Sequence, residues 1–541
     1  MHVRSIRHVL MAGILAVLLA APMVASGLTV DGIDVRVIND NNNVDGGTPN
    51  PSFDAQNRQQ NETTVAISPV DPDIVAAGAN DYRMASAFGD SWLGFFVSDD
   101  GGATWFNTMV PGFPTDTSAA GQASPLLGLD GSGDPVVRLD AEGNLYVAGI
   151  AFNRNFDQPD RPVDSVVYVA RYDYTPGTAG GVSTPFSAAN PPNLTYVGTT
   201  VVDRGAVGFA IPSNQPFGIT GEFVDKEWME VDTNPQEDSV CAGNAYVAYT
   251  AFHGVGGNSP IKFSRSGDGG GTFSRPRTIS TGGQAGTSYN QGSDIAVGPD
   301  GTVYVAYRTF ASNVDPSAIN IVKSTDCGVH WTQPVVAGTI VSGQAPGVQF
   351  RTPTFAFVTA DDVNPNIVYL AYQNFAGDNY DIYVQRSTDG GATWEAPIPV
   401  NDDVTARHQV FPTMQVSNGA LHLAWYDFRN STTPGNEALD VYYACTNCEG
   451  AVYPAFSPNV RVTDVSHESN CLMFGGGTAA FHGDYIELDA RFDGSGHVVH
   501  VAWADNRDVV GCDLDPAPGP PTNNTGNRNQ SIYADTLTVG P

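Results

Sequence analysis

Five arginines occupy similar places in a chain that has few basic residues. The 541 residues include only 25 lysines and arginines, against 57 aspartates and glutamates. The five are found at the ends of recurring hydrophobic strands: Arg83, Arg308, Arg351, Arg429 and Arg507. Guanidinium groups that converge from different strands could bind a carboxylate through paired hydrogen bonds. Alternatively, each arginine pairs with an acid next to it, as Asp427 with Arg429 or Asp505 with Arg507, and only tethers its loop.

Carboxyl groups and a tyrosine are found at equivalent strand ends. Asp134, Glu227 and Asp484 lie where such strands begin, and Tyr485 follows directly. A protonated and an ionised carboxyl group can act as general acid and general base in cleaving a glycosidic bond. The other candidates at strand entrances are Glu62, Asp225, Lys226, Asp294, His408 and His482, and those at strand exits are Asp81, Tyr82, Arg154, His253, Asp427 and Asp505.

The strands that must position these side chains belong to a repeated hairpin. Each copy has two hydrophobic strands joined by a tight polar turn, and the second strand often reads Tyr-Val-Ala-Tyr. Alternating apolar residues, β-branched residues and turns such as Pro299-Asp300-Gly301 predict β-hairpins. Aligned on one alanine, the seven copies fall at Ala77, Ala148, Ala248, Ala306, Ala371, Ala424 and Ala502.

A polar turn motif, Ser-x-Asp-x-Gly-x-Thr-Trp, follows a third strand in four repeats. Residues 98–105 and 387–394 are complete copies, 266–273 ends in Phe, and 324–331 has His in place of Thr. The Asp carboxylate and the hydroxyls can accept hydrogen bonds from turn amides, and glycine allows positive φ angles. We expect these four segments, the Ser-Asp motifs, to stabilise turns and not to supply catalytic aspartates.

Four-stranded units that repeat around an axis form a β-propeller. We predict an all-β propeller with seven four-stranded antiparallel blades, six being the alternative if one hairpin lies outside the ring. After the seventh hairpin only one more strand, 531–539, precedes the end of the chain. Because residues 34–40 resemble the fourth strands at 397–402 and 459–464, we expect the N-terminal segment to complete the last blade.

Strand direction assigns the connections to two faces of the propeller. The tight turns and the Ser-Asp motifs share one face, because neighbouring strands are antiparallel. The opposite face holds the long loops, such as 153–164, 427–440 and 505–529. Loops on a rigid scaffold often carry binding groups, so we expect the functional site on this second face.

The first 26 residues predict a secretory signal peptide. Arg4 and Arg7 precede an apolar stretch from Val9 to Ala21, and Val24-Ala25-Ser26 forms a small-residue cleavage site. Residues 27–541 then form a single propeller domain, with 27–60 as closing strand and linker. We expect an exported, monomeric product without a membrane span, found outside the cell or in the periplasm.

Six cysteines suggest disulfides in an exported protein, with 15 pairings open. They are Cys241, Cys327, Cys445, Cys448, Cys471 and Cys512. Cys445 and Cys448 form a CxxC pair. This pair is either a local disulfide, which we favour, or half of a zinc site.

Charge and composition limit the other partners. The formal net charge of −32 disfavours nucleic-acid binding through a broad basic surface. The charged fraction of 15%, with 59 glycines and 37 prolines, disfavours a coiled coil or a highly charged disordered chain. We expect no required cofactor. The oxygen-rich segment 39–47 could bind a structural calcium ion, although an acidic linker is the interpretation we favour.

The Ser-Asp motifs, with the hairpins between them, make the chain resemble the sialidase superfamily and exported Asp-box (BNR-repeat) propeller proteins. The resemblance covers nearly all of the mature chain. It implies three arginines that hold a substrate carboxylate, a tyrosine nucleophile assisted by a glutamate, and an aspartate as general acid and base. Tyr485 is the candidate nucleophile, with ordinary packing as the alternative that we favour.

The sequence departs from the sialidase pattern in two respects. The Arg-Ile-Pro or Arg-Leu-Pro motif of that family is absent near the first blade, where Arg83 is followed by Met84. The similar string Arg351-Thr352-Pro353 lies far downstream. Sialidases also have six blades, whereas this chain has seven repeats.

Two functions follow from the sequence. One is a secreted, sialidase-like, exo-acting glycoside hydrolase that acts on sialylated or other acidic glycans. The other is a noncatalytic extracellular propeller that binds glycans or protein partners.

Overall fold

The structure is a computed structural model that describes residues 27–30, 32–38, 59–84, 90–153, 164–174, 193–206, 221–233, 241–253, 258–280, 289–311, 314–432, 437–474, 479–509, 512 and 530–541. The predicted signal peptide, the 39–47 segment and Arg154 lie outside these ranges.

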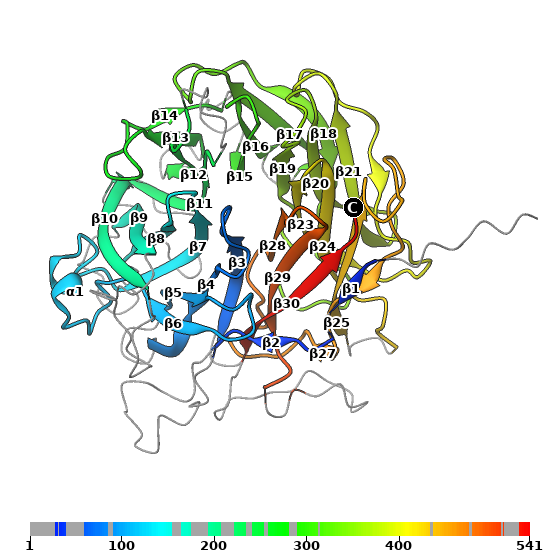
Figure 1. Ribbon diagram of the computed structural model, residues 1–541, viewed down its shortest axis with the longest axis horizontal. Coiled ribbons are helices and arrows are strands. Elements are labelled where there is room, and N and C mark those ends of the chain that lie inside the picture. The colour runs from blue at the N-terminus through cyan, green and yellow to red at the C-terminus, as the bar shows by residue number, and fades with distance from the viewer. Residues whose placement is uncertain are drawn as a thin grey trace, which may run out of the picture.

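Seven antiparallel sheets surround a common axis (Figure 1). The first strands of successive blades contact one another around this axis, and the later strands of each blade lie further out. The predicted all-β propeller with seven blades is therefore confirmed, and the alternative of six blades is wrong. Among the described residues, no helix is long and apolar enough to cross a membrane.

The blades follow the chain in order, and each is numbered here by its place in the sequence. Blade 1 consists of β3 (Gln60–Ile67), β4 (Val75–Asp81), β5 (Trp92–Ser98) and β6 (Phe106–Met109), and blade 2 of β7 (Gly131–Leu139), β8 (Asn144–Phe152), β9 (Ser165–Tyr174) and β10 (Leu194–Arg204). Blade 3 consists of β11 (Glu222–Val231), β12 (Ala245–His253), β13 (Ile261–Ser266) and β14 (Arg277–Thr278), and blade 4 of β15 (Tyr289–Val297), β16 (Val303–Ala311), β17 (Val314–Ser324) and β18 (Val335–Ile340).

The remaining blades carry the additional strands of the fold. Blade 5 consists of β19 (Ala356–Ala360), β20 (Val368–Ala376), β21 (Asn379–Ser387) and β22 (Ile398–Pro399). Blade 6 consists of β23 (Gln409–Ser417), β24 (Ala420–Asp427), β25 (Ala438–Thr446) and β26 (Val460–Arg461), with β27 (His467–Glu468) also paired to β25. Blade 7 contains β28 (Glu487–Phe492), β29 (His497–Asp505) and β30 (Ser531–Val539); a short helix α1 (Ala119–Ala123) and a 3-10 turn η2 (Tyr82–Met84) lie in loops.

The N-terminal segment closes the ring. β1 (Thr29–Val30) and β2 (Val35–Arg36) both pair antiparallel with β30, and Val35 lies opposite Ala534. This confirms the expectation that the N-terminal segment completes the last blade. Arg507 reinforces the closure, because its guanidinium group donates to Asp34 at 2.5 Å.

A bulge interrupts the innermost strand in five blades. The pairing register shifts in β3, β7, β11, β15 and β23. The bulges place five residues in the left-handed backbone region: Glu62, Asp134, Lys226, Gly292 and Phe411. Left-handed backbone is uncommon for residues other than glycine, and bulges often redirect a side chain. Glu62, Asp134 and Lys226 occupy it at φ values of 56°, 55° and 50°, in three consecutive blades.

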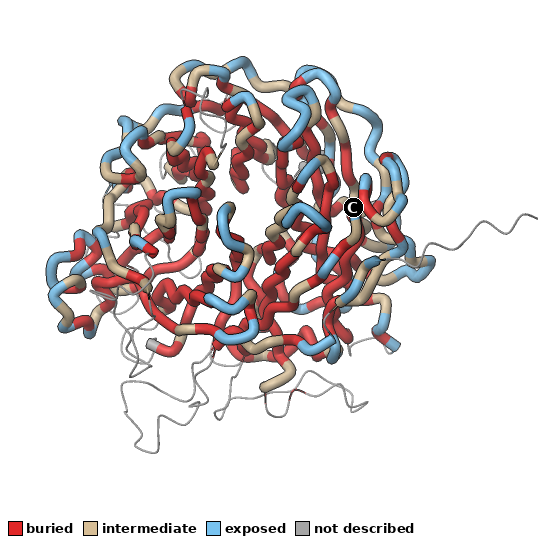
Figure 2. The backbone as a smooth tube through the Cα atoms, viewed as in Figure 1, coloured by how far each residue is buried: buried red, intermediate tan, exposed pale blue. Residues whose placement is uncertain are grey.

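The core lies within and between the blades, and exposed residues concentrate in the connections (Figure 2). Its largest completely buried side chains include Trp92, Trp425 and Trp503. Side chains of one inner strand also bind the backbone of the next. Thr64 Oγ1 accepts the N–H of Val137 at 3.2 Å, and similar bonds join blade 4 to blade 5, blade 6 to blade 7 and blade 7 to blade 1.

The Ser-Asp motifs form four equivalent turns. In each, the Asp carboxylate accepts the N–H of the residue four positions later at 2.8 Å. The Ser hydroxyl accepts a glycine N–H at 2.8–2.9 Å. These hydrogen bonds lower the pKa of Asp268, Asp326 and Asp389 to about 2. The aspartates therefore support turns, on the face opposite the long loops.

Three disulfides resolve the cysteine pairing. The bonds join Cys241 to Cys327, Cys445 to Cys448, and Cys471 to Cys512. The CxxC pair is thus a local disulfide, and the zinc alternative is wrong. The first bond ties blade 3 to the Ser-Asp motif of blade 4.

Candidate active site

The bulge residues of blades 1 to 3 meet at the end of the axis that carries the long loops. Asn80, near the end of β4, connects two of them. Its Nδ2 donates to Glu62 Oε2 at 2.7 Å, and its Oδ1 accepts the backbone N–H of Asp134 at 2.8 Å. Asp134 Oδ2 in turn accepts the N–H of Lys226 at 3.1 Å. The left-handed backbone at these positions is thus held by hydrogen bonds from one blade to the next.

Arg351 joins this group from the connection between blades 4 and 5. It forms a bidentate pair with Asp484, with Nε–Oδ1 and Nη2–Oδ2 distances of 2.6 and 2.7 Å. Its Nη2 also lies 3.8 Å from Glu62 Oε1. The side chain of Arg351 is 61% exposed, whereas that of Glu62 is 4% exposed. Glu62 therefore lies at the base of the group and Arg351 at its open side.

Burial and like charges set the ionisation of this group. The pKa of Glu62 is raised well above its usual value, first by burial and then by the negative charges of Asp134 and Asp484. Arg351 opposes this rise. Burial also raises the pKa of Asp484, and Arg351 again acts in the opposite direction. The site thus contains a carboxyl group that holds a proton more tightly than usual, next to partly exposed Asp134.

An aromatic layer lies under the carboxyl groups. The Lys226 ammonium group is 4.0 Å from the ring centroid of Tyr485, 4.7 Å from that of Trp228 and 5.6 Å from that of Phe355. Tyr485 is completely buried, and its hydroxyl donates to Pro135 O at 3.3 Å. Burial raises the pKa of Tyr485 well above its usual value. This environment supports the packing alternative for Tyr485, because the phenol is buried and neutral.

Glu227 is also completely buried. Neither of its carboxylate oxygens has a hydrogen-bond partner among the described residues. Burial, followed by the charge of Asp134, raises its pKa well above the usual value. Glu227 therefore holds its proton more tightly than usual and, because it is completely buried, is not open to a substrate.

The other four candidate arginines are engaged elsewhere. Three belong to a repeated Asp-x-Arg turn at the end of a second strand, in which the Asp binds both the backbone N–H and the guanidinium group of the Arg. These pairs are Asp81 with Arg83, Asp427 with Arg429, and Asp505 with Arg507.

Further contacts direct these arginines away from the axis. Arg429 lies over Tyr442 of β25, and Arg507 over Tyr533 of β30, both in third strands. Arg308 donates to Ser317 of β17 at 2.7 Å and to Ser342 at 2.6 Å. Of the five arginines, the structure therefore places only Arg351 beside Glu62 and Asp484. Arg83, Arg429 and Arg507 each pair with the neighbouring aspartate, as the alternative for these arginines predicts.

Several other strand-entrance candidates have structural contacts. His408 bonds to the backbone of Pro346 and Tyr380, and His482 bonds to Ser469 and Asn506. Burial lowers the pKa of His482 to about 3. His253 lies 3.2 Å from Glu222 at the end of β12. None of these contacts includes Glu62, Asp134 or Arg351.

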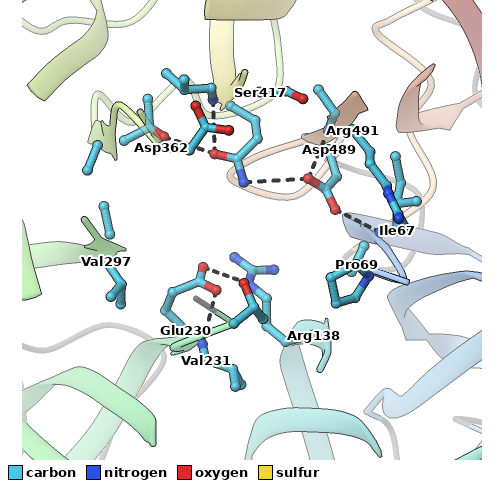
Figure 3. Close-up of a pocket in the computed structure, with 18 of the residues that line it drawn as sticks. Ile67, Pro69, Arg138, Glu230, Val231, Val297, Asp362, Ser417, Asp489 and Arg491 are labelled. Atoms are coloured by element: carbon cyan, nitrogen blue, oxygen red, sulfur yellow. Dashed lines mark hydrogen bonds and ion pairs between the residues drawn. The ribbon is translucent and has the colours of Figure 1, made fainter. Parts of the chain in front are cut away.

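A second polar space lies on the axis, toward the tight turns. This cavity has a volume of about 580 Å³ and is lined by all seven inner strands. Arg138 lines it and pairs with Glu230 at 2.9 Å (Figure 3). Arg138 also pairs with Glu487 at 2.9 Å. Asp489 accepts the N–H of Ile67 at 2.7 Å, also drawn in Figure 3. These charged groups are held by one another and by backbone.

The carboxyl groups of this cavity also hold protons tightly. Burial raises the pKa of Asp294 to about 8 and that of Glu487 to about 7. Sequence reasoning did not identify Arg138 and Glu230. The feature of the sequence that could have indicated them is a charged residue inside an otherwise apolar inner strand, as in Val136-Val137-Arg138.

Among the described residues, no group of three or more His, Cys, Asp or Glu side chains has an arrangement that could hold a metal ion. The chemistry that the site offers is that of its carboxyl groups. A protonated carboxyl group beside an ionised one can act in acid and base catalysis.

No family model matches the sequence. A curated relative, a xyloglucanase from Hypocrea jecorina (strain QM6a), is 25% identical over a match of 254 residues that covers 42% of this chain. The matched segment spans 28% of the xyloglucanase. The chain thus covers little more than a quarter of that relative.

Solved structures that align with this chain share little sequence with it. A protein of unknown function from Dyadobacter fermentans DSM 18053 aligns over 95% of this chain and 99% of its own, with 13% identity and a TM-score of 0.43. A Hadza microbial sialidase aligns over 82% of this chain and 73% of its own, with 14% identity and a TM-score of 0.39. A Trypanosoma rangeli sialidase aligns over 69% and 52%, with 13% identity and a TM-score of 0.38.

Proposed function

We propose that this protein is a glycoside hydrolase whose active site is formed by Glu62, Asp134, Arg351 and Asp484. The observation that carries the proposal is the state of Glu62. Its carboxyl group is buried, has a raised pKa and lies beside other carboxyl groups at the loop-bearing end of the axis. A carboxyl group whose raised pKa makes it hold its proton more tightly than usual is suited to protonate the oxygen of a leaving group.

Each residue has a distinct role in this proposal. Glu62 donates its proton to the glycosidic oxygen as the bond to the anomeric carbon breaks. Asp134, which is partly exposed, is the second carboxyl group and stabilises the positive charge on the sugar, acting on the anomeric carbon directly or through a water molecule. The bidentate pair of Arg351 and Asp484 presents one donor group and one acceptor group to sugar hydroxyls.

The charges favour a neutral glycan over an acidic one. A substrate carboxylate would meet Glu62, Asp134 and Asp484, and of the five candidate arginines only Arg351 pairs with one of these acids. The positive charge that develops on a sugar ring is better matched to this acidic surrounding. The name of the curated relative, a xyloglucanase, fits this substrate class. The three disulfides fit an oxidising compartment, which supports secretion.

The test is hydrolysis of a panel of aryl glycosides by the purified protein. The panel contains glucosides, cellobiosides, xylosides, arabinofuranosides and a sialoside, with xyloglucan as a polymeric substrate. We expect turnover of at least one neutral substrate, and a loss of about 10²–10⁴-fold in Glu62→Gln and Asp134→Asn. Glu230→Gln, a carboxyl-to-amide change on the other side of the aromatic layer, is the matched control and keeps activity.

Three outcomes would contradict the proposal. Hydrolysis of the sialoside alone would favour the acidic-glycan function. Binding to glycans without turnover of any substrate would favour the noncatalytic propeller. Full activity in folded Glu62→Gln would place the chemistry elsewhere.

A further inference from the structure

We propose that Asn80 is a positioning residue that keeps the acidic proton of Glu62 on Oε1, the oxygen that faces Arg351. This inference rests on the proposed function, because it concerns the proton that Glu62 is to donate. It is carried by the orientation of a buried chain of side-chain amides. The chain consists of Gln530, Asn61 and Asn80, which are 0%, 0% and 5% exposed.

One end of this amide chain is fixed by a backbone donor. The backbone N–H of Asp134 can only donate, and it lies 2.8 Å from Asn80 Oδ1. Turning the Asn80 amide around would place two donors against each other. The amide nitrogen therefore faces Glu62, and Nδ2 donates to Oε2 at 2.7 Å.

The other end is fixed by a backbone acceptor. The carbonyl of Phe481 can only accept, and Gln530 Nε2 donates to it at 2.7 Å. Gln530 Oε1 is then left to accept from Asn61 Nδ2 at 3.1 Å, and Asn61 Oδ1 to accept from Asn80 Nδ2 at 3.3 Å. The two anchors belong to different parts of the chain, yet they require the same orientation of all three amides.

The fixed orientation determines which Glu62 oxygen carries the proton. Oε2 receives an N–H donor, so a proton on that oxygen would face another hydrogen. The proton is therefore on Oε1, which lies 3.8 Å from Arg351 Nη2, beyond hydrogen-bond distance. Asp134 is a side-chain hydrogen-bond partner of Glu62. Oε1 thus lies toward the open side of the group, where Arg351 is and where a substrate would enter.

Asn80 also places the partner of Glu62. The same amide holds the backbone N–H of Asp134, whose φ of 55° is in the left-handed region. Glu62 has nearly the same conformation, at 56°. One side chain thus connects the proton donor to the backbone of Asp134, across two blades.

The test uses Asn80→Asp, which can still accept from Asp134 but cannot donate to Glu62. A hydrogen bond donated to a carboxylate favours its ionised form, so its loss, with an added negative charge, raises the pKa of Glu62. We expect the basic limb of the kcat/KM profile to move up by about one pH unit, with a fall in kcat of about tenfold or more. Asn320→Asp, a buried amide in blade 4, is the matched control and leaves the limb unchanged.

A second readout does not depend on activity. Carbon NMR titration of labelled glutamate, with Glu62→Gln to assign the signal, measures the Glu62 pKa in wild type and Asn80→Asp. A rise in the variant supports the inference even if no substrate is turned over, a result that would contradict only the proposed function. An unchanged pKa, or a loss of activity with an unchanged limb, overturns the role of Asn80 and leaves the proposed function standing. If Asn80→Asp does not fold, Asn80→Ser removes the same donor.

Discussion

Replacing Asp294 by asparagine should remove a large part of the loss of stability that we expect at higher pH. Asp294 is 6% exposed, and its carboxylate accepts the N–H groups of Val358 and Ile295. Burial raises its pKa from 3.8 to about 8. The folded protein therefore binds this proton more tightly than the unfolded chain does. Asparagine is a neutral side chain of the same shape and does not titrate.

The sign and size of the effect follow from the two pKa values. The stability that proton binding contributes is complete below the unfolded pKa, near 4, and is lost as the pH rises through the folded value of about 8. The loss amounts to about 1.4 kcal/mol for each pH unit in this window. Between pH 5 and 8 the wild-type free energy of unfolding should fall relative to that of Asp294→Asn by about 4 kcal/mol.

The assay is urea unfolding of both proteins at pH 5, 6, 7 and 8, followed by the fluorescence of the buried tryptophans. The quantity compared is the difference between the two free energies of unfolding, in which the other titrating groups cancel. Asp493→Asn is the control, because turn hydrogen bonds lower the pKa of this exposed aspartate and it does not titrate above pH 5. A difference that stays constant from pH 5 to 8 would refute the reasoning.

Three further predictions concern the turns, the closure and the site. Ser387→Ala removes the hydroxyl that accepts the N–H of Gly391, so the free energy of unfolding, measured in urea, should fall by about 1–2 kcal/mol; an unchanged value would contradict the turn's role. Arg507→Leu removes the partner of Asp34 and Asp505, so the free energy of unfolding should fall by about 3–5 kcal/mol in the same assay. An unchanged value would show that this closure does not contribute to stability. Arg351→Ala removes the charge that lowers the pKa of Glu62, so the basic limb of kcat/KM should move to higher pH, and an unchanged limb would separate Arg351 from Glu62.

The fold was predictable because each blade repeats a local pattern. Period-two alternation, a tight turn and the Ser-Asp motif recur, so every repeat indicates the same antiparallel unit. The closing strand was predictable for the same reason, since residues 34–40 resemble other fourth strands. It pairs with β30, which belongs to the last blade, and that blade is one strand short in the seventh repeat of the sequence.

The site was less predictable because it depends on backbone conformation and on distant contacts. Glu62 was recognised as a strand-entrance residue, but its central position depends on a bulge with positive φ. The orientation of Asn80 depends on Asp134 and Gln530, which lie far from it in the sequence. The arginines show the opposite case. The Asp-x-Arg spacing contained the signal for local pairing, and this pairing removes them from a shared pocket.

The central claim is that Glu62 is the proton donor of a glycoside hydrolase, and the dependence on the leaving group tests it most directly. The measurement compares kcat/KM of wild type and Glu62→Gln on two glycosides of the same sugar, one with an alkyl and one with a dinitrophenyl leaving group. A dinitrophenolate departs without protonation, so loss of the acid should matter little for it. We predict a loss of about 10²–10⁴-fold for the alkyl glycoside and a much smaller loss for the dinitrophenyl glycoside. Equal losses on both substrates, or none on either, would contradict the assignment of Glu62.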